Sequence, residues 1–365
     1  MAQSKKIFED LFVLEMTNNH LGRLDRGLEI VRVYSRLARF NNVRAAIKLQ
    51  FRELETFVHK DFRDRTDIRY VKRISETRLS KEEYAVLVKA IRDGGLLPMA
   101  TPFDEASVDM CVEFGLPIIK VASADSNDWI LLEKIARTKK PVIVSVAGMS
   151  LKDLDDLVLF FENRNIPLAI NHCVAAYPTE DDELELNQID FLRERYPGHV
   201  IGHSTHEYKD WSSSLLIAYA KGVRTFERHV DITSDGVQIA AYSSTPEQID
   251  TWFKAFKKAQ VMCGASGLER KKPMEKETVF LDNYIRGVYA KRDLPAGHML
   301  TNETYEQDVY LAYPLQKGQI SCRELMNGET LLKPVLADKP INIDMVDSPY
   351  AYSEKLRKEI EGRGL

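Results

Sequence analysis

Short, continuously apolar runs alternate with stretches of helical periodicity along the first 266 residues. We predict eight β-strands, because uninterrupted apolar runs of this length are typical of parallel strands covered on both faces. The predicted strands are residues 11–16, 45–51, 96–103, 117–123, 141–146, 167–174, 199–206 and 225–232. Eight strand–helix units in about 255 residues favour an α/β fold, a (β/α)8 TIM barrel. An open doubly wound sheet is the alternative, but no G-x-G-x-x-G motif follows the first run.

The segments between the runs carry helix start and stop signals. Ser80-Lys-Glu-Glu83 and Thr245-Pro-Glu-Gln248 each predict a capping box, and Ser150 predicts a third N-cap. Gly94 and Gly264 predict the ends of two of these helices. These signals support the alternation of strands and helices.

The pattern changes after about residue 275. Short extended runs, separated by turn-like segments, predict a small β-rich domain at residues 276–348, after a barrel domain at 1–275. These runs are residues 288–290, 298–300, 305–311 and 330–332. Residues 349–365 predict a charged helical tail with a solvated face.

Composition narrows the class of protein. Of the 365 residues, 44% are hydrophobic and 29% are charged, and the net charge is −4. This balance disfavours a broad nucleic-acid surface, and no apolar run is long enough for a membrane span. The N-terminus lacks a signal-peptide pattern, and the four cysteines form no C-x-x-C motif. We therefore expect a cytoplasmic protein that acts on small molecules.

Polar side chains interrupt nearly every apolar run close to its end. In a (β/α)8 barrel the active site lies at the C-terminal ends of the strands. The polar residues there are Glu15, Lys48, Gln50, Thr101, Lys120, Ser123, Asp125, Ser145, Asn171, His172, Tyr177, Ser204, His206, Glu227 and His229. Such groups are costly to bury without a partner or a function. Their presence at nearly every strand end therefore indicates the active site of an enzyme.

Two lysines suggest an anion site. Lys48 and Lys120 lie on the second and fourth runs of an acidic protein, where they would bind phosphate or carboxylate. The structural alternative is a salt bridge to Glu15 or Asp125. A Schiff-base lysine, as in class I aldolases, also remains open.

Two histidines suggest a metal site. His206 and His229 end the seventh and eighth runs, and two imidazoles with water and substrate oxygens would form an open divalent site. A buried core or surface role is the alternative for either one. His20 and His172 are candidates for orienting groups, and we treat His59, His199 and His298 as surface residues.

Carboxylates and hydroxyls complete the candidate site. Glu15 and Asp125 are candidates for a general base or for a carboxylate that orients substrate. Thr101, Ser123 and Ser204 could donate hydrogen bonds to phosphate or carboxylate oxygens.

Seven motifs in order resemble those of the sialic acid synthase family (N-acetylneuraminate and related nonulosonate synthases). The resemblance extends from the first strand to about residue 346. The motifs are Glu15-Met-Thr-Asn-Asn-His20-Leu-Gly22, Lys48-Leu-Gln50, Thr101-Pro-Phe-Asp104, Lys120-Val-Ala-Ser123-Ala-Asp125, His172-Cys-Val-Ala-Ala-Tyr177-Pro178, Gly202-His-Ser204-Thr-His206 and Glu227-Arg-His229. The β-rich domain is similar to the family's antifreeze-like (SAF) domain.

The resemblance implies a reaction and its residues. Phosphoenolpyruvate would condense with the aldehyde of an N-acylated hexosamine, consuming water and releasing phosphate by C–O cleavage. It implies that His206 and His229 hold Mn²⁺ or Mg²⁺. It implies that Lys48 and Lys120 bind phosphoenolpyruvate, with help from Thr101, Ser123 and Ser204. It also implies that Asp125 activates water and that Glu15 and Tyr177 contact the sugar. Gln50 and His172 are further candidate substrate-binding residues.

The sequence departs from the family's pattern mainly on the sugar side. Ala175 replaces an asparagine or serine, so one hydrogen bond to phosphoenolpyruvate would be missing, and residues 236–243 lack the family's Asp-His pair. Tyr313 precedes Pro314, where bacterial members place an arginine, and the family's S-T-G-M reads Ser145-Val-Ala-Gly-Met149. We therefore expect an acceptor sugar other than N-acetylmannosamine.

The resemblance also implies a homodimer in which the C-terminal domain caps the partner's barrel. Two other functions stay open from the residues: another metal- or Schiff-base-dependent barrel aldolase, and a catalytically altered relative that binds a sugar.

Overall fold

The chain divides into two compact units. The computed structural model describes residues 6–233, 236–264 and 270–365. The first unit is Met1–Gly264 and the second is Ala265–Leu365, so the division precedes the boundary expected at residue 275. Each unit has a hydrophobic core of its own.

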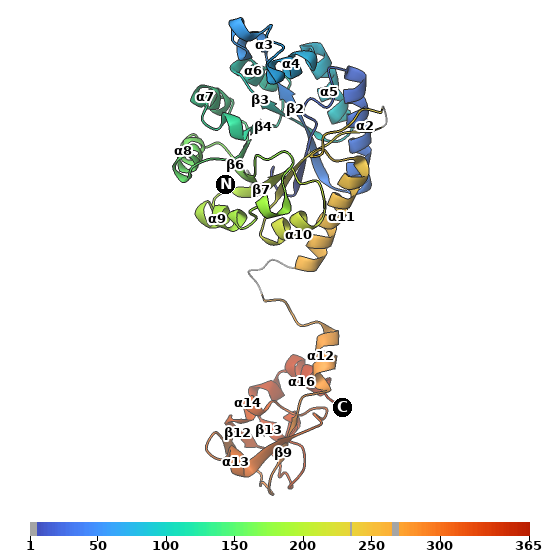
Figure 1. Ribbon diagram of the computed structural model, residues 1–365. Coiled ribbons are helices and arrows are strands. Elements are labelled where there is room, and N and C mark those ends of the chain that lie inside the picture. The colour runs from blue at the N-terminus through green and yellow to red at the C-terminus, as the bar shows by residue number, and fades with distance from the viewer. Residues whose placement is uncertain (1–5, 234–235, 265–269) are drawn as a thin grey trace. The chain divides into compact units, whose positions relative to one another are not determined.

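The first unit is a closed barrel of eight parallel strands in sequence order, as predicted (Figure 1). Its strands are β1 (Leu11–Glu15), β2 (Arg44–Phe51), β3 (Leu97–Pro102), β4 (Ile118–Val121), β5 (Val142–Ser145), β6 (Leu168–Cys173), β7 (Val200–Thr205) and β8 (Thr225–His229). The barrel closes between β1 and β8, where Glu15 lies in register with His229. Closure therefore brings the first and last predicted strand ends together.

Helices surround the strands of the first unit (Figure 1). They are α2 (Leu24–Phe40), α3 (Leu54–Phe57), α4 (Arg69–Glu76), α5 (Lys81–Asp93), α6 (Glu105–Glu113), α7 (Trp129–Arg137), α8 (Leu151–Glu162), α9 (Gln188–Arg195), α10 (Ser213–Ala220) and α11 (Pro246–Cys263). The capping boxes at Ser80 and Thr245 and the N-cap at Ser150 are confirmed. Gly94 and Gly264 occupy the C-caps of α5 and α11.

Alternation of side chains sorts each strand into two faces. One set of alternate residues, including Val13, Ala46 and Met99, forms a small cluster inside the barrel. The other set, including Leu14, Ile47 and Ala100, packs in the large core shared with the helices. Because the inward face is apolar at the start of the strands and polar at their ends, the polar groups gather at one end. We call this end the barrel mouth.

Aromatic packing fixes α11 against the place where the barrel closes. The ring of Phe12 on β1 stacks on Phe226 of β8 with centroids 5.1 Å apart. It also meets Trp252, Phe253 and Phe256 of α11 edge-on, with centroids 4.8–5.0 Å apart. Such offset and edge-to-face pairs are favourable beyond the area they bury.

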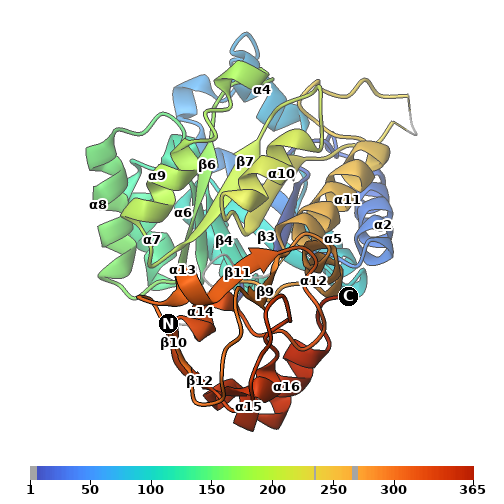
Figure 2. The ribbon, with the colours of Figure 1, turned by 90° about the horizontal axis from the view of Figure 1, so that it is seen from below.

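The second unit contains two small sheets. One has the order β10 (Met299–Thr301), β12 (Asn327–Leu331), β13 (Val346–Asp347), and the other pairs β9 (Gly287–Ala290) antiparallel with β11 (Val309–Ala312), as Figure 2 shows. The prediction of a continuous extended run at 305–311 is wrong. Residues Tyr305–Asp308 instead form one turn of helix, α13, and β11 begins only at Val309.

The C-terminal residues belong to the second unit. Helices α12 (Glu275–Asp282), α14 (Cys322–Leu325), α15 (Pro349–Tyr352) and α16 (Glu354–Glu361) complete it. The predicted tail is thus helical, but Tyr350 and Ile360 pack against the unit's core rather than leaving the whole segment in solvent. Among the described residues, none of the helices has the length and apolar character that a membrane crossing requires.

Candidate active site

Two buried lysines meet two carboxylates inside the barrel mouth. Lys48 forms ion pairs with Glu15 and with Glu227, the latter at 2.8 Å. Lys120 lies 3.8 Å from the other oxygen of Glu227 and donates a 2.7 Å hydrogen bond to Ser145 Oγ. The salt bridge to Glu15, which is the structural alternative for the lysines, is present at Lys48, yet Glu227 is the acid that both lysines share.

The electrostatic balance of this cluster is tight. Lys48 and Lys120 are only 4% and 2% exposed. Burial lowers the pKa of Lys48 to about 8, although Glu227 opposes the shift. Burial also disfavours the Glu227 carboxylate, but Lys120 and Lys48 outweigh this effect and lower its pKa. The two lysines and the two carboxylates thus neutralise one another. An anion that entered the site could replace a carboxylate as the partner of the lysines.

Neutral hydrogen-bonding side chains surround the lysine cluster. Lys48 donates to Thr101 Oγ1 at 3.2 Å, and Asn171 donates to Glu227 Oε2 at 3.2 Å. Gln50 donates to Glu15 Oε1 at 3.4 Å. Gln50, Thr101 and Asn171 come from β2, β3 and β6, so the barrel itself positions them.

Asp125 lies at the mouth on the 3-10 turn η2 (Ser123–Asp125) after β4. Burial raises the pKa of its carboxyl to about 6, although the charges of Arg52 and Lys120 oppose the shift. Its Oδ2 atom is buried without a hydrogen-bond partner. Ser123 accepts a 3.1 Å hydrogen bond from the Ala147 amide. A carboxylate suits the role of proton acceptor when its pKa lies near the pH at which the protein works and one of its oxygens has no hydrogen-bond partner.

The two histidines predicted as metal ligands lie side by side. The ring centroids of His206 and His229 are 5.2 Å apart. His206 Nδ1 lies 3.0 Å from the Val174 carbonyl, to which it donates, and this leaves Nε2 available. The Nδ1 atom of His229 is buried without a partner. Burial lowers the pKa of His206 to about 4 and that of His229 well below its usual value, so both rings are neutral.

This pair fits an open metal site. Neutral imidazoles with a free nitrogen are suitable ligands for Mn²⁺ and acceptable for Mg²⁺ when oxygen ligands complete the shell. Among the residues the structure describes, no group of three or more histidine, cysteine, aspartate or glutamate side chains has a metal-binding arrangement. The two histidines would therefore supply the protein's share, and water or substrate oxygens would supply the rest.

Two tyrosines form an aromatic wall beside the histidines. The Tyr177 ring lies 3.9 Å from that of His206, and Tyr242 lies 5.2 Å from Tyr177 and 5.1 Å from His229, all between centroids. Tyr177 follows β6 and Tyr242 lies in the loop after β8. This wall is built by loops, in contrast to the lysine cluster, which is built by strands.

A buried polar network holds the base of the loop after β8. Arg228 pairs with Glu207 at 2.8 Å and donates to Ser244 Oγ at 2.8 Å. Tyr34 donates to the Ser244 carbonyl at 2.7 Å, and Arg26 pairs with Asp231 at 2.6 Å. Each charge is matched, as buried ion pairs require, so the loop that carries Tyr242 has a fixed base.

The structure does not bring His172 into this set. Its Nε2 lies 2.8 Å from the Leu184 carbonyl, and its ring stacks on His203 at 5.8 Å. Its neighbours Asn171 and Cys173 occupy the inward positions of β6, so His172 points to the other face. His20 is also separate, because it accepts from the Gly22 amide and packs edge-on against Tyr84. Burial lowers its pKa to about 4.

Sequence reasoning missed three contributors. The sequence places Glu227 among the polar strand-end residues without a role, and its sharing of both lysines follows only once β8 closes on β1. Arg52, whose charge acts on the pKa of Asp125, follows Lys48 and Gln50 at the same spacing of two, and this spacing could have revealed it. Tyr242 gave no signal, because a loop position has no periodicity.

The fold and site together define a class of protein. It is a (β/α)8 barrel with a candidate anion site of two lysines beside a candidate two-histidine metal site. The family model described as the NeuB family matches residues 41–267, which is more than half of the chain. The chain belongs to this family, the sialic acid synthases.

Known relatives agree with this assignment. A solved Chromobacterium violaceum protein named for spore coat polysaccharide biosynthesis is 39% identical, with a TM-score of 0.88, over 93% of this chain and all of that one. An uncharacterised protein of Methanocaldococcus jannaschii is 28% identical over 78% of this chain and 80% of its own. Human N-acetylneuraminate-9-phosphate synthase is 24% identical over 92% of both chains.

Proposed function

We propose that this protein is a nonulosonate synthase, which condenses phosphoenolpyruvate with the aldehyde of an N-acylated hexosamine and releases phosphate. The observation that carries the proposal is the pair of buried lysines sharing Glu227, with two neutral histidines at the adjoining strand ends. Family membership and the named relatives support it.

The lysine cluster would bind phosphoenolpyruvate. Its carboxylate or phosphate would take Lys48 and Lys120 as partners in place of the shared carboxylate, since charge-assisted hydrogen bonds to an anion are strong in a desolvated site. Thr101 and Ser145 already contact the lysine nitrogens, while Ser123 follows β4, the strand of Lys120, and Ser204 lies near the end of β7. These hydroxyls would complete the binding site.

The histidines would hold Mn²⁺ or Mg²⁺. A divalent cation bound there would polarise the aldehyde of the acceptor sugar. Asp125 would accept a proton from the water that is consumed, because its carboxyl is ionised above about pH 6 and has a free oxygen. Tyr177 would position the sugar beside His206.

The experiment is a phosphate-release screen. Purified protein with Mn²⁺ and phosphoenolpyruvate is tested against N-acylated hexosamines, including N-acetylmannosamine, its 6-phosphate and diacylated sugars. Release that depends on both the sugar and the metal supports the proposal. No release with any of these sugars contradicts it. Fastest release with N-acetylmannosamine would contradict only the expected change of acceptor.

A second candidate function follows from one observation. The pKa of Lys48 is lowered to about 8, and a lysine of this kind can form a Schiff base, as in the barrel aldolases. Borohydride reduction in the presence of pyruvate would trap such an adduct on Lys48. The ion pairs of Lys48 with Glu15 and Glu227 disfavour this function, because they hold the ammonium form.

We further propose that the protein forms a homodimer in which the second unit lies over the partner's barrel. Light scattering would give twice the 41.8 kDa chain mass. A chain truncated after Gly264 would be inactive. A monomeric mass with full activity contradicts this arrangement.

A further inference from the structure

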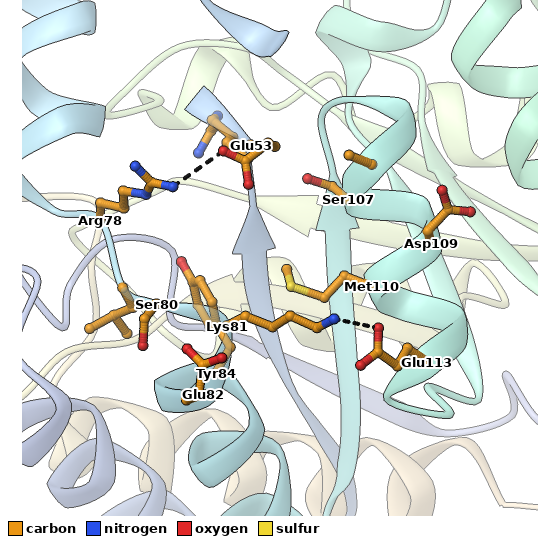
Figure 3. Close-up of a pocket in the computed structure, with 13 residues that line it drawn as sticks. Glu53, Arg78, Ser80, Lys81, Glu82, Tyr84, Ser107, Asp109, Met110 and Glu113 are labelled. Carbon is orange, nitrogen blue, oxygen red and sulfur yellow. Dashed lines mark hydrogen bonds and ion pairs between the residues drawn. The ribbon is translucent and has the colours of Figure 1, made fainter. Parts of the chain in front are cut away.

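A cavity of about 600 Å³ lies outside the barrel, between the first turn of α5 and one side of α6 along its length (Figure 3). Its volume is within the range of small-molecule sites. Its lining residues are Arg52, Glu53, Arg78, Leu79, Ser80, Lys81, Glu82, Tyr84, Ala106, Ser107, Asp109, Met110 and Glu113. Apart from Arg52, whose charge also acts on the pKa of Asp125, none of them belongs to the candidate active site. We call it the α5–α6 pocket.

Two polar groups of this pocket have unused hydrogen-bonding capacity. Ser107 is 2% exposed, and its Oγ atom is buried without a partner. Figure 3 shows this hydroxyl directed across the pocket toward Glu53. The Nε atom of Arg52 is likewise buried without a partner. Buried donors without partners are rare and costly, so both atoms indicate a ligand that would satisfy them.

Arg52 is also the cation of this pocket without an acidic partner. Arg78 pairs with Glu53 at 3.2 Å, and Lys81 pairs with Glu113 at 2.6 Å, as Figure 3 shows. Among the described residues, no carboxylate forms an ion pair with Arg52, which instead stacks over Phe103 at 3.6 Å. A desolvated guanidinium held in this way is a suitable partner for a carboxylate or phosphate.

The remaining lining favours a hydroxylated ligand over a bare anion. Glu53, Glu82, Asp109 and Glu113 would repel a small dianion, but carboxylates readily accept hydrogen bonds from hydroxyl groups. The ring of Tyr84 and the side chains of Leu79 and Met110 offer apolar surface for the carbon face of a sugar ring.

We propose that the α5–α6 pocket binds a sugar acid, with its anionic group on Arg52 and a hydroxyl on Ser107. Arg52 also donates to Gln50 Oε1 at 3.0 Å, and Gln50 in turn donates to Glu15. The pocket is thus connected to the lysine cluster by two hydrogen bonds. A sugar acid is also the class of product that the condensation yields, and this link alone rests on the proposed function.

The test is a calorimetric titration of the full chain with N-acetylneuraminate as the probe, with and without saturating phosphoenolpyruvate. The methyl ester of the same sugar is the control for charge. We expect the acid to bind in both conditions and the ester to bind at least about tenfold more weakly, a difference of about 1.4 kcal/mol. Binding of the ester as tightly as the acid would overturn the proposal, as would no binding of the acid.

Two tryptophan variants locate the bound probe. Ala106→Trp would fill the pocket from an exposed position on α6, whereas Val112→Trp places the same side chain on an exposed position of α6 that does not line the pocket. Binding should be lost in the first variant and kept in the second. Equal binding in both would place the probe elsewhere and overturn the proposal. Because no turnover is measured, a failed phosphate-release screen leaves this test unaffected.

Discussion

The two sides of the barrel mouth are built differently. Lys48, Lys120 and Glu227 come from strands, are almost fully buried, and satisfy one another through ion pairs. Tyr177 and Tyr242, beside the histidines, come from loops, are more exposed, and interact through their rings. The strand side is rigid because barrel hydrogen bonds fix its backbone. The loop side can change its residues without altering the barrel.

This difference explains where the sequence departs from the family's pattern. Lys48, Lys120 and Ser123 match the motifs on the strand side, whereas the loop at 236–243 lacks the family's Asp-His pair on the other side. A substrate shared by all members would require an unchanged strand side, and different acceptors would require variable loops. The comparison therefore predicts separable effects: strand-side changes should alter anion binding, and loop-side changes should alter the choice of sugar.

Removal of one histidine should have the greatest effect on catalysis. His206→Ala deletes one of two protein ligands, so we expect Mn²⁺ affinity and turnover to fall by more than about 100-fold, beyond the loss typical of changes outside the first coordination shell. Calorimetry with Mn²⁺ and phosphate release measure the two quantities. His199→Ala, at a histidine paired with Glu162 on the outside of the barrel, is the matched control. Unchanged Mn²⁺ binding in His206→Ala would remove the metal assignment.

Loss of a lysine should weaken the strand side as a whole. Lys48→Met leaves Glu15 and Glu227 buried without one of their counter-charges, so we expect a loss of about 3–5 kcal/mol in the free energy of unfolding. Phosphoenolpyruvate binding should also disappear. Denaturant unfolding measures the first effect, and Lys89→Met, at an exposed pair with Asp93, should cost less than about 0.5 kcal/mol. Similar losses in both variants would mean that the buried ion pairs of Lys48 contribute no more to the free energy of unfolding than an exposed ion pair does.

The strand side was also the more predictable side. Apolar runs located all eight strands, and the spacing of Lys48 and Gln50 by two placed both on the inward face. The same rule, applied strictly, would have excluded His172, which alternates with the inward residues Asn171 and Cys173. The sharing of Glu227 depends on barrel closure, and the position of Tyr242 depends on a loop anchored by Arg228 and Ser244. Neither has a local signature in the sequence.

The pH dependence tests Asp125, which ends the turn η2 after β4. Because its folded pKa is about 6 and it acts when ionised, kcat/KM should fall about tenfold per pH unit below pH 6. Asp125→Asn should remove both the activity and this fall of kcat/KM at low pH. If the variant kept some activity and the same fall below pH 6, the titration would belong to another group, such as the substrate phosphate.

The stability of the same variant gives an independent check. A carboxyl whose pKa is raised by folding favours the folded state below its ordinary pKa of 3.8 and loses this contribution as pH rises through about 6. Asp125→Asn should therefore exceed the wild-type chain in thermal midpoint above pH 6, and the difference should shrink toward pH 4. A difference independent of pH would contradict the raised pKa.

The smallest effect should come from the loop side. Tyr242→Ala removes a ring that packs on Tyr177 and His229, and aromatic pairs of this kind are worth about 0.5–1.5 kcal/mol. If the ring shapes the acceptor site, KM for the sugar should rise by about 2- to 10-fold and KM for phosphoenolpyruvate should stay unchanged, while the free energy of unfolding should fall by no more than about 1.5 kcal/mol. Tyr242→Phe, which keeps the ring, should restore the wild-type KM. Equal changes in both KM values would show that the two sides are not independent, and the comparison would then fail.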